Sequence, residues 1–275
     1  MLLSASAPQI LGVVEGARLR FGEEPKGEGT WAGRRLLFLD ERPAFDLTFW
    51  CGTCQLLFTR LDGANQTVSL KDAADRLADG LDGIDEAIVE RFAELLPQGS
   101  YLPMLIEIEP RLVFPLDDDD YFANEQVATW NVERFWGLPH YPKTPYYRTF
   151  QTPVADHAHL YEFVVPMVPP NWNNAERVKE LAERLTESSR PTAVAVSTLD
   201  ISQPANGSAP NWYAHWGLTH FLLDGHHKLA AAAQIGKPVQ LLSLLSLDAS
   251  LASPEQIQRV PELLTRPAGP RPATT

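Results

Sequence analysis

Five consecutive residues combine the chemistry that holds a phosphate group: Asp224, Gly225, His226, His227 and Lys228. They lie in the text THFLLDGHHKLAAA, where an apolar run passes directly into an alanine-rich stretch, so a buried strand is expected to lead into a helix at this turn. A helix N-terminus has unpaired backbone N–H groups and a partial positive charge, and both attract an anion. Gly225 lets the backbone approach a ligand, and the two histidines and the lysine add donors. We therefore predict a phosphate site at residues 224–228.

Asp224 has several open roles in this turn. Its carboxylate suits capping the helix, holding Mg²⁺ or taking a proton from a hydroxyl group. The same turn is also compatible with a simple helix cap followed by ordinary turn histidines. The position of the turn between a strand and a helix favours the anion site, because an anion binds to the free N–H groups at a helix N-terminus.

The two cysteines, Cys51 and Cys54, lie in the text FWCGTCQLLF with the C-x-x-C spacing of thiol–disulfide exchange. WCGTC is similar to the WCGPC of thioredoxins, but Thr53 replaces the proline and the text that follows lacks a clear thioredoxin pattern. A second interpretation is half of a tetrahedral zinc site, whose other ligands must be His or Asp/Glu. A third is two buried cysteines beside a core strand. All three remain open.

Several other polar residues have spacings that suit a site. His157 and His159 share a face if their segment is a strand, and such a pair suits either a metal or a polar strand start. The run from Asp117 to Asp120 is expected to be a solvated loop, because four adjacent carboxylates repel one another.

Aromatic and histidine residues surround the segment that enters the turn. His215 and His220 flank Trp216 and are candidates for the wall of the pocket. Trp212, Tyr213 and Trp216 suit stacking on a base or ring, and they suit aromatic packing equally well.

The sequence predicts strands and helices on both sides of the turn, and these elements must position it. Residues 159–169 and 190–201 predict strands, residues 174–189 an amphipathic helix capped by Asn173 or Asn174, and residues 236–247 a further strand. Before them, the first forty-odd residues predict antiparallel strands, residues 69–96 two helices that separate near Gly80 and Gly83, and residues 101–115 a strand. The aromatic span 129–153 has no clear period and is expected to be a packed connection or part of a binding wall.

Residues 159–247, with their strand, helix, strand order and Asp-Gly-His-His-Lys turn, resemble the ParB/sulfiredoxin superfamily, and most of all the branch with an Asp-Gly-His-His-Arg turn that includes free-serine kinases. The resemblance implies that Gly225 to Lys228 hold the phosphates of ATP or ADP with Mg²⁺. It also implies that Asp224 contacts the metal or acts as a catalytic acid or base, and that His227 takes part in catalysis. Serine kinases place a glutamate after the first strand; Glu176 is the residue nearest that position, and the alternatives are Glu162, Asp156 and Asp200.

The sequence differs from that superfamily at positions that bear on which of its activities are expected here. Lys228 gives a point charge where the branch has the fork of an arginine. His226 stands where sulfiredoxins carry their reactive cysteine, so sulfinic acid reduction is not supported. The helical DNA-binding domain and basic surface of ParB proteins are not evident in this sequence.

The predicted organisation is an α+β chain: an N-terminal mixed region at 1–150 with the C-x-x-C pair, a ParB/sulfiredoxin-like α/β domain at 151–265, and a flexible tail at 266–275. With 44% hydrophobic and 21% charged residues, the 275-residue chain has the composition of a globular protein. Its net charge of −12 argues against nucleic acid or an anionic membrane as a partner. No apolar run approaches a membrane span and no basic signal region begins the chain, so we expect a cytoplasmic protein.

The function expected from these features is a nucleotide-dependent phosphotransferase that acts on a small hydroxylated metabolite. The alternatives are a non-catalytic protein that senses nucleotide and binds a partner, and a thiol redox enzyme that uses Cys51 and Cys54.

Overall fold

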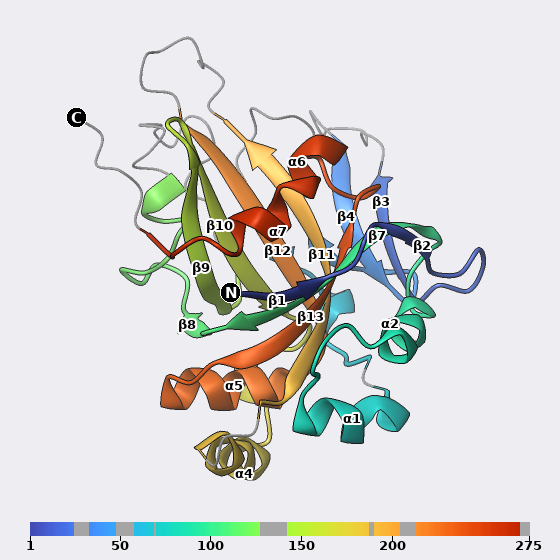
Figure 1. The fold of residues 1–275 in the computed structure, drawn as a ribbon, viewed down its shortest axis with the longest axis vertical. Coiled ribbons are helices and arrows are strands. Elements are labelled where there is room, and N and C mark those ends of the chain that lie inside the picture. Colours follow the sequence, from blue (N-terminus) through green and yellow to red (C-terminus); the bar gives the residue numbers. More distant parts are fainter. Residues whose placement is uncertain are drawn as a thin grey trace.

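The computed structural model describes residues 1–24, 33–47, 58–68, 70–126, 142–186, 190–203 and 213–269. Within them the protein has the predicted α+β class, built on a large mixed sheet with strand order β1-β7-β13-β11-β12-β10-β9-β8 and with β2 paired to β7 (Figure 1). The strands of this sheet are β1 Leu2–Ala5, β2 Gln9–Leu11, β7 Gly99–Ile108, β8 Arg111–Val113, β9 Tyr146–Ala155, β10 Ala158–Pro166, β11 Thr192–Ser202, β12 Ala214–Asp224 and β13 Val239–Ser246.

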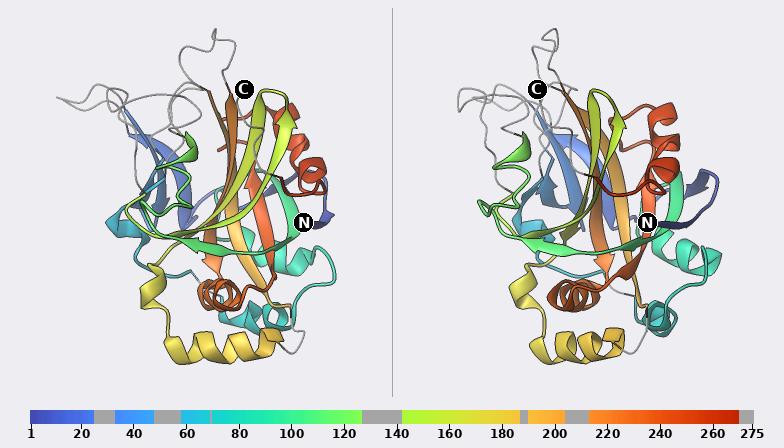
Figure 2. Two further views of the ribbon diagram at one scale, coloured as in Figure 1. Left: turned by 90° about the vertical axis from the view of Figure 1, so that its left-hand side faces the viewer. Right: turned by 60° about the vertical axis from the view of Figure 1, so that its left-hand side comes forward.

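A second, antiparallel sheet packs against one face of the large sheet. It contains β3 Leu19–Glu24, β4 Arg34–Leu39, β5 Arg42–Asp46 and β6 Thr59–Arg60, which confirms the antiparallel strands expected near the start of the chain. Short helices α6 Pro254–Gln258 and α7 Val260–Leu263 cover the other face of the large sheet (Figure 2). The result is a layered molecule with the large sheet in the middle.

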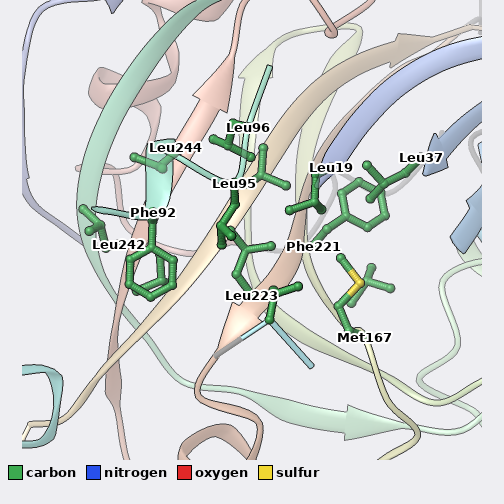
Figure 3. Packing of buried hydrophobic residues seen from close by; sticks show 14 of the residues in the cluster. Leu19, Leu37, Phe92, Leu95, Leu96, Met167, Phe221, Leu223, Leu242 and Leu244 are labelled. Atoms are coloured by element: carbon green, nitrogen blue, oxygen red, sulfur yellow. The ribbon is translucent and has the colours of Figure 1, made fainter. Parts of the chain in front are cut away.

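Alternation of apolar side chains along the central strands gives two cores, one on each face of the large sheet. Phe221 and Leu223 of β12 point into the core between the sheets, where they meet Leu19, Leu37 and their neighbours (Figure 3). Leu218 and Leu222 of the same strand point into the opposite core, beneath the C-terminal helices. Each fully buried leucine or phenylalanine contributes roughly 2 kcal/mol by leaving water.

One buried ion pair joins the two sheets. Arg35 on β4 donates to both carboxylate oxygens of Asp200 on β11, at 2.8 and 3.1 Å, and both side chains are nearly inaccessible to solvent. Asp200 also accepts from the backbone N–H of Leu251 at 3.0 Å. This aspartate is therefore occupied in holding the two layers together.

The two helices expected at 69–96 are confirmed as α1 Ala74–Asp79 and α2 Glu86–Ala93, preceded by a single turn η2 at Lys71–Ala73. Gly80 ends α1 with a φ of 94°, and the side chain of Asp85 caps α2 by accepting from Ala87 and Ile88. Ser69, the expected cap, lies outside the described residues.

The C-terminal half has the predicted element order. After β10 come the turn η4 Pro170–Trp172, helix α4 Ala175–Thr186, β11, β12, helix α5 His226–Ile235 and β13. In space, however, β12 lies between β10 and β11, parallel to β10 and antiparallel to β11. The strands on either side of α4 are therefore separated by the strand that carries the turn.

The large sheet draws strands from both parts of the predicted division at residue 150. That boundary lies inside β9, and β7 from the N-terminal part pairs with β13 from the C-terminal part. The same strand begins at Tyr146, so part of the span 129–153, expected to lack a strand, is regular β-structure. Residues 127–141 of that span lie outside the described part.

Among the described residues, no helix is long and apolar enough to cross a membrane.

Candidate functional site

The predicted passage from strand to helix at the turn is confirmed. β12 ends at Asp224 and α5 begins at His226, with Gly225 between them at a φ of 100°. A Cβ atom on Gly225 would lie 2.6 Å from the Cβ of Ala193 on β11, so both the left-handed backbone and the close approach to the neighbouring strand require glycine. The residue at the N-cap is Gly225, and no side chain caps the helix. Asp224 therefore does not cap α5, which removes one of its three expected roles.

The side chain of His226 is used inside the fold. It is 6% exposed, and its Nε2 accepts the backbone N–H of Met167, at 3.1 Å, just beyond the end of β10. Burial lowers the pKa of His226 to about 4, so the ring is neutral at physiological pH. What this residue offers a ligand is the backbone of the first helical turn and not the imidazole that the sequence suggested.

His227 joins the turn to the start of α4. Its Nε2 accepts the backbone N–H of Asn174 at 3.1 Å, and burial together with nearby Arg177 lowers the pKa of the imidazole. The side chain of Asn173 reinforces the same junction by donating to the backbone oxygen of His226 at 3.4 Å. The junction fixes α4 against the N-terminus of α5.

Lys228 and Asp224 form a largely buried ion pair. Lys228 Nζ lies 3.1 Å from Asp224 Oδ2 and also donates to the backbone oxygen of Thr192 at 2.7 Å. Burial lowers the pKa of Lys228. The two side chains remain 12% and 14% exposed, so this pair is reachable from solvent.

A cavity of about 400 Å³ opens over the turn, between α1, η4 and α4. Its described walls are Thr67, Ala74, Ala78, Val168, Trp172, Asn173, Arg177, Leu181, Arg184 and all five residues of the turn, Asp224 to Lys228. We call this cavity the turn pocket. Its volume lies in the range of small-ligand sites.

The turn pocket has a cationic wall. Arg177, Arg184 and Lys228 line it, and Asp224 is the carboxylate among its described wall residues. The two arginines form ion pairs with Glu180 at 3.2 Å and with Asp79 at 3.5 Å, in both cases between largely exposed side chains. Exposed pairs of this kind contribute little to stability, so both guanidinium groups can turn to a bound anion at small cost.

Arg177 and Arg184 were not singled out from the sequence, although a signal for them existed. They lie seven residues apart in the helix predicted at 174–189, and that spacing places both on one face. The face could not be assigned to a site until the position of α4 against the turn was known.

The predicted acids do not gather at the turn pocket. Glu176 is exposed in the first turn of α4 and is not among the pocket's described wall residues, and Asp156 is exposed in the turn between β9 and β10. Asp200 pairs with Arg35 between the sheets, and Glu162 is buried in the middle of β10. The carboxylate that remains at the pocket is Asp224.

Glu162 belongs to a chain of hydrogen bonds that crosses five strands. Its Oε1 lies 3.2 Å from His220 Nε2, His220 Nδ1 lies 2.6 Å from Ser197 Oγ, and Ser197 Oγ lies 2.9 Å from Ser243 Oγ. Thr149 Oγ1 donates to the other oxygen of Glu162. We call these five residues the buried polar chain.

The buried polar chain has the residue types of a serine hydrolase triad, but a substrate cannot reach these residues as it reaches a triad. Glu162, His220 and Ser197 are at most 1% exposed, and none of them lines the turn pocket. Burial would raise the pKa of Glu162, but the hydrogen bond and charge of His220 and the hydrogen bond of Thr149 hold that pKa below its ordinary value. The arrangement satisfies buried polar groups, and the expectation that His220 lines the pocket is wrong.

The other histidines take separate places. His157 is exposed in the turn that precedes β10 and His159 is buried on the strand, so the expected pair on one strand face does not form. His215 is fully buried on β12, with its Nδ1 2.5 Å from the hydroxyl of Tyr121, and does not line the turn pocket. Within the described part of the chain, no group of three or more His, Cys, Asp or Glu residues could hold a metal ion.

Of the aromatic residues expected to stack on a ligand, Tyr213 and Trp216 are 5% exposed and do not line the turn pocket. Arg259 packs over the Trp216 ring at 5.3 Å. Trp172, which was not predicted, lines the turn pocket and is 60% exposed. Trp212, Cys51 and Cys54 lie outside the described residues, so the three interpretations of the cysteine pair stay predictions.

In the acidic run, Asp117, Asp118 and Asp119 are exposed as expected. Asp120 is buried and accepts from the hydroxyl of Tyr146 at 2.8 Å and from the backbone N–H of Leu116 at 2.8 Å. The fourth carboxylate is thus part of the fold and not of a solvated loop.

In comparisons with known proteins, the chain matches no family model, no curated protein and no solved structure. The resemblance to the ParB/sulfiredoxin superfamily therefore remains a prediction from the sequence.

Proposed function

We propose that the protein is a nucleotide-dependent phosphotransferase that binds ATP or ADP at the turn pocket and phosphorylates a small hydroxylated molecule. The observation that carries the proposal is the turn pocket itself, where Arg177, Arg184 and Lys228 surround the N-terminus of a ten-residue helix. Aligned backbone N–H groups and three cations are the surroundings that a di- or triphosphate requires. The exposed indole of Trp172 at the same pocket supplies a surface on which a nucleobase can stack.

Asp224 is the residue to which we assign activation of the acceptor hydroxyl. In the proposed reaction, the acceptor oxygen forms a bond to phosphorus, the bond from phosphorus to the leaving oxygen of the nucleotide breaks, and Asp224 takes the proton of the acceptor hydroxyl. Lys228, 3.1 Å from Asp224, keeps that carboxylate oriented and offers positive charge to the phosphates. Positioning and charge neutralisation would supply most of the rate enhancement.

The residues at the turn pocket fit Mg²⁺ only as a companion of the nucleotide. No cluster of three ligating side chains occurs among the described residues, and a protein site of that kind is not needed, because Mg²⁺ usually keeps water ligands and bridges one or two carboxylates to phosphate oxygens. Asp224 is the carboxylate positioned for this role. When bound, the ion would neutralise charge on the phosphates.

The test combines binding and turnover. Isothermal titration with Mg²⁺ and ADP should show a single site, and ³¹P NMR with ATP and a panel of hydroxylated acceptors should show a new phosphate ester. Asp224→Asn should reduce turnover at least 100-fold, and it should change the affinity for ADP measured without Mg²⁺ less than about 5-fold. Glu176→Gln is the matched control, since this acid is close in sequence to the pocket but outside its described walls, and it should leave both measurements unchanged.

Two results would count against the proposal. Failure of ADP to bind would remove the nucleotide site, and normal turnover by Asp224→Asn would remove the assigned base. Binding without turnover across the acceptor panel would instead favour the non-catalytic, nucleotide-sensing alternative.

A further inference from the structure

A second and larger cavity lies beside the turn pocket. Its volume is about 950 Å³, and its walls come from the β8–β9 edge of the large sheet and from helices α4 and α5. Figure 1 shows where these elements lie in the fold. Its wall is mainly apolar and includes Leu112, Phe114, Tyr147, Val178, Ala230 and Ala233. We call it the apolar groove.

Two features show that the apolar groove is more than a packing irregularity. Phe114 is 51% exposed and Leu112 is 36% exposed, so large apolar side chains face solvent where a ligand would cover them. On the opposite wall, α5 presents the small side chains of Ala230 and Ala233, which leave room for a flat or narrow body. A cavity of this size can enclose a molecule of several hundred daltons.

The polar groups of the groove are few and are placed at particular points. Lys179 of α4 is the charged residue among the described walls, and the amides of Asn171 and Gln234 accompany it. Asn173 lines both the groove and the turn pocket, so the two cavities are neighbours at this residue. A ligand held in the groove can therefore direct one end toward the turn pocket.

We infer that the apolar groove binds a small amphiphile with an apolar aromatic or aliphatic body, an anionic group paired with Lys179, and a hydroxyl directed past Asn173. Identification of this molecule as the phosphoryl acceptor rests on the proposed function, whereas its binding to the groove does not. Sugars and small polar amino acids lack the apolar surface that this wall would cover.

The experiment uses 8-anilinonaphthalene-1-sulfonate, which has an apolar body and one anionic group, as a fluorescent probe on the full chain. We expect saturable binding at one site, displaced by 10-hydroxydecanoate. Ala233→Trp and Gln234→Trp each place an indole in the groove and should weaken probe binding at least 10-fold. Lys179→Gln should weaken it roughly 3- to 10-fold, because the charge pair is partly exposed.

Matched controls separate the groove from general effects. Lys237→Gln removes an exposed lysine just beyond α5, and Ala7→Trp adds an indole at an exposed position near β1, at the opposite edge of the large sheet. Both should change probe affinity less than 2-fold. Gln234 is exposed, so its tryptophan variant needs no space in the core and guards against misfolding of Ala233→Trp; near-ultraviolet circular dichroism checks both.

The outcomes separate this inference from the proposed function. Unchanged probe binding in both tryptophan variants would overturn the groove as the site, and competitive displacement of the probe by ADP would show that the groove holds the nucleoside and overturn the assigned occupant. Loss of probe binding in the groove variants with unchanged ADP affinity is the expected result. If ADP binds nowhere and the probe results hold, the groove stands and the phosphotransferase proposal fails.

Discussion

The buried polar chain and the turn pocket both combine histidine with a carboxylate, but they differ in their contact with solvent. In the first, Glu162 and His220 lie 3.2 Å apart with at most 1% of either side chain exposed. In the second, Asp224 stays partly exposed beside Lys228, and His227 lies at the wall of a cavity. The residue types of the buried chain are those of a catalytic triad, yet the pocket is the better candidate, because chemistry needs a place for a substrate. The comparison predicts that changes in the chain affect stability and that changes in the pocket affect binding.

The largest effect is expected from Glu162→Leu. It leaves His220 buried without its carboxylate and should lower the free energy of unfolding by about 3–5 kcal/mol, measured by urea denaturation. Glu162→Gln, which retains the shape and one acceptor, should cost less. A loss below 1 kcal/mol for Glu162→Leu together with a large loss of ADP affinity would reverse the comparison.

The second effect concerns pH and His226. The pKa of this residue is about 4 in the fold, below the ordinary value of roughly 6.5 expected in the unfolded chain. Between these values the unfolded chain binds a proton that the folded chain does not, so stability should fall by about 3 kcal/mol as the pH falls from about 6.5 to about 4. Denaturation curves at several pH values measure this loss. His226→Gln, which can still accept from Met167, should flatten the profile, and an unchanged profile would show that other groups control it.

Gly225→Ala should destabilise the fold by roughly 2 kcal/mol, because alanine is strained at a φ of 100° and its Cβ meets Ala193. The matched control is Gly83→Ala, where an added Cβ meets nothing within 4 Å and stability should change little. Thermal denaturation compares the two. Equal effects at both positions would mean that the turn tolerates a side chain and that its glycine is not required by the fold.

The smallest effect on stability is expected from Arg184→Ala. Its ion pair with Asp79 is exposed, so the free energy of unfolding should change by less than about 0.5 kcal/mol, while ADP affinity should fall roughly 10-fold. Arg190→Ala, which removes a more exposed arginine outside the turn pocket, should alter neither quantity. A loss of ADP affinity in both variants would indicate general electrostatic attraction and not a site.

The sequence was informative where local signals decide the structure. The strand before Asp224 and the alanine helix after it are specified by periodicity, and both occur as predicted. Gly225 was expected to let the backbone approach a ligand, and the structure gives it a second reason, a left-handed φ beside Ala193. The use of the rings of His226 and His227 was not predictable, because their partners, Met167 and Asn174, come from a segment more than fifty residues earlier.

The errors share the same physical origin. The boundary placed at residue 150 and the expected position of His220 depend on strand order, and the place of Glu176 relative to the turn pocket depends on how α4 is positioned. Contacts between distant residues set both. The helical face of Arg177 and Arg184 can be assigned to a site only when the position of α4 against the turn is known.

The pairing of β7 with β13 has a consequence for how the molecule can be divided. A chain that begins at residue 151 would lack β7, and the backbone N–H and C=O groups of Val239–Ser246 on that side would form a long, apolar, unprotected sheet edge. Such edges recruit strands from other molecules, so the C-terminal half produced alone should aggregate even though it carries the whole turn. During synthesis, the edge of β7 that pairs with β13 likewise stays unpaired until more than a hundred further residues have been made.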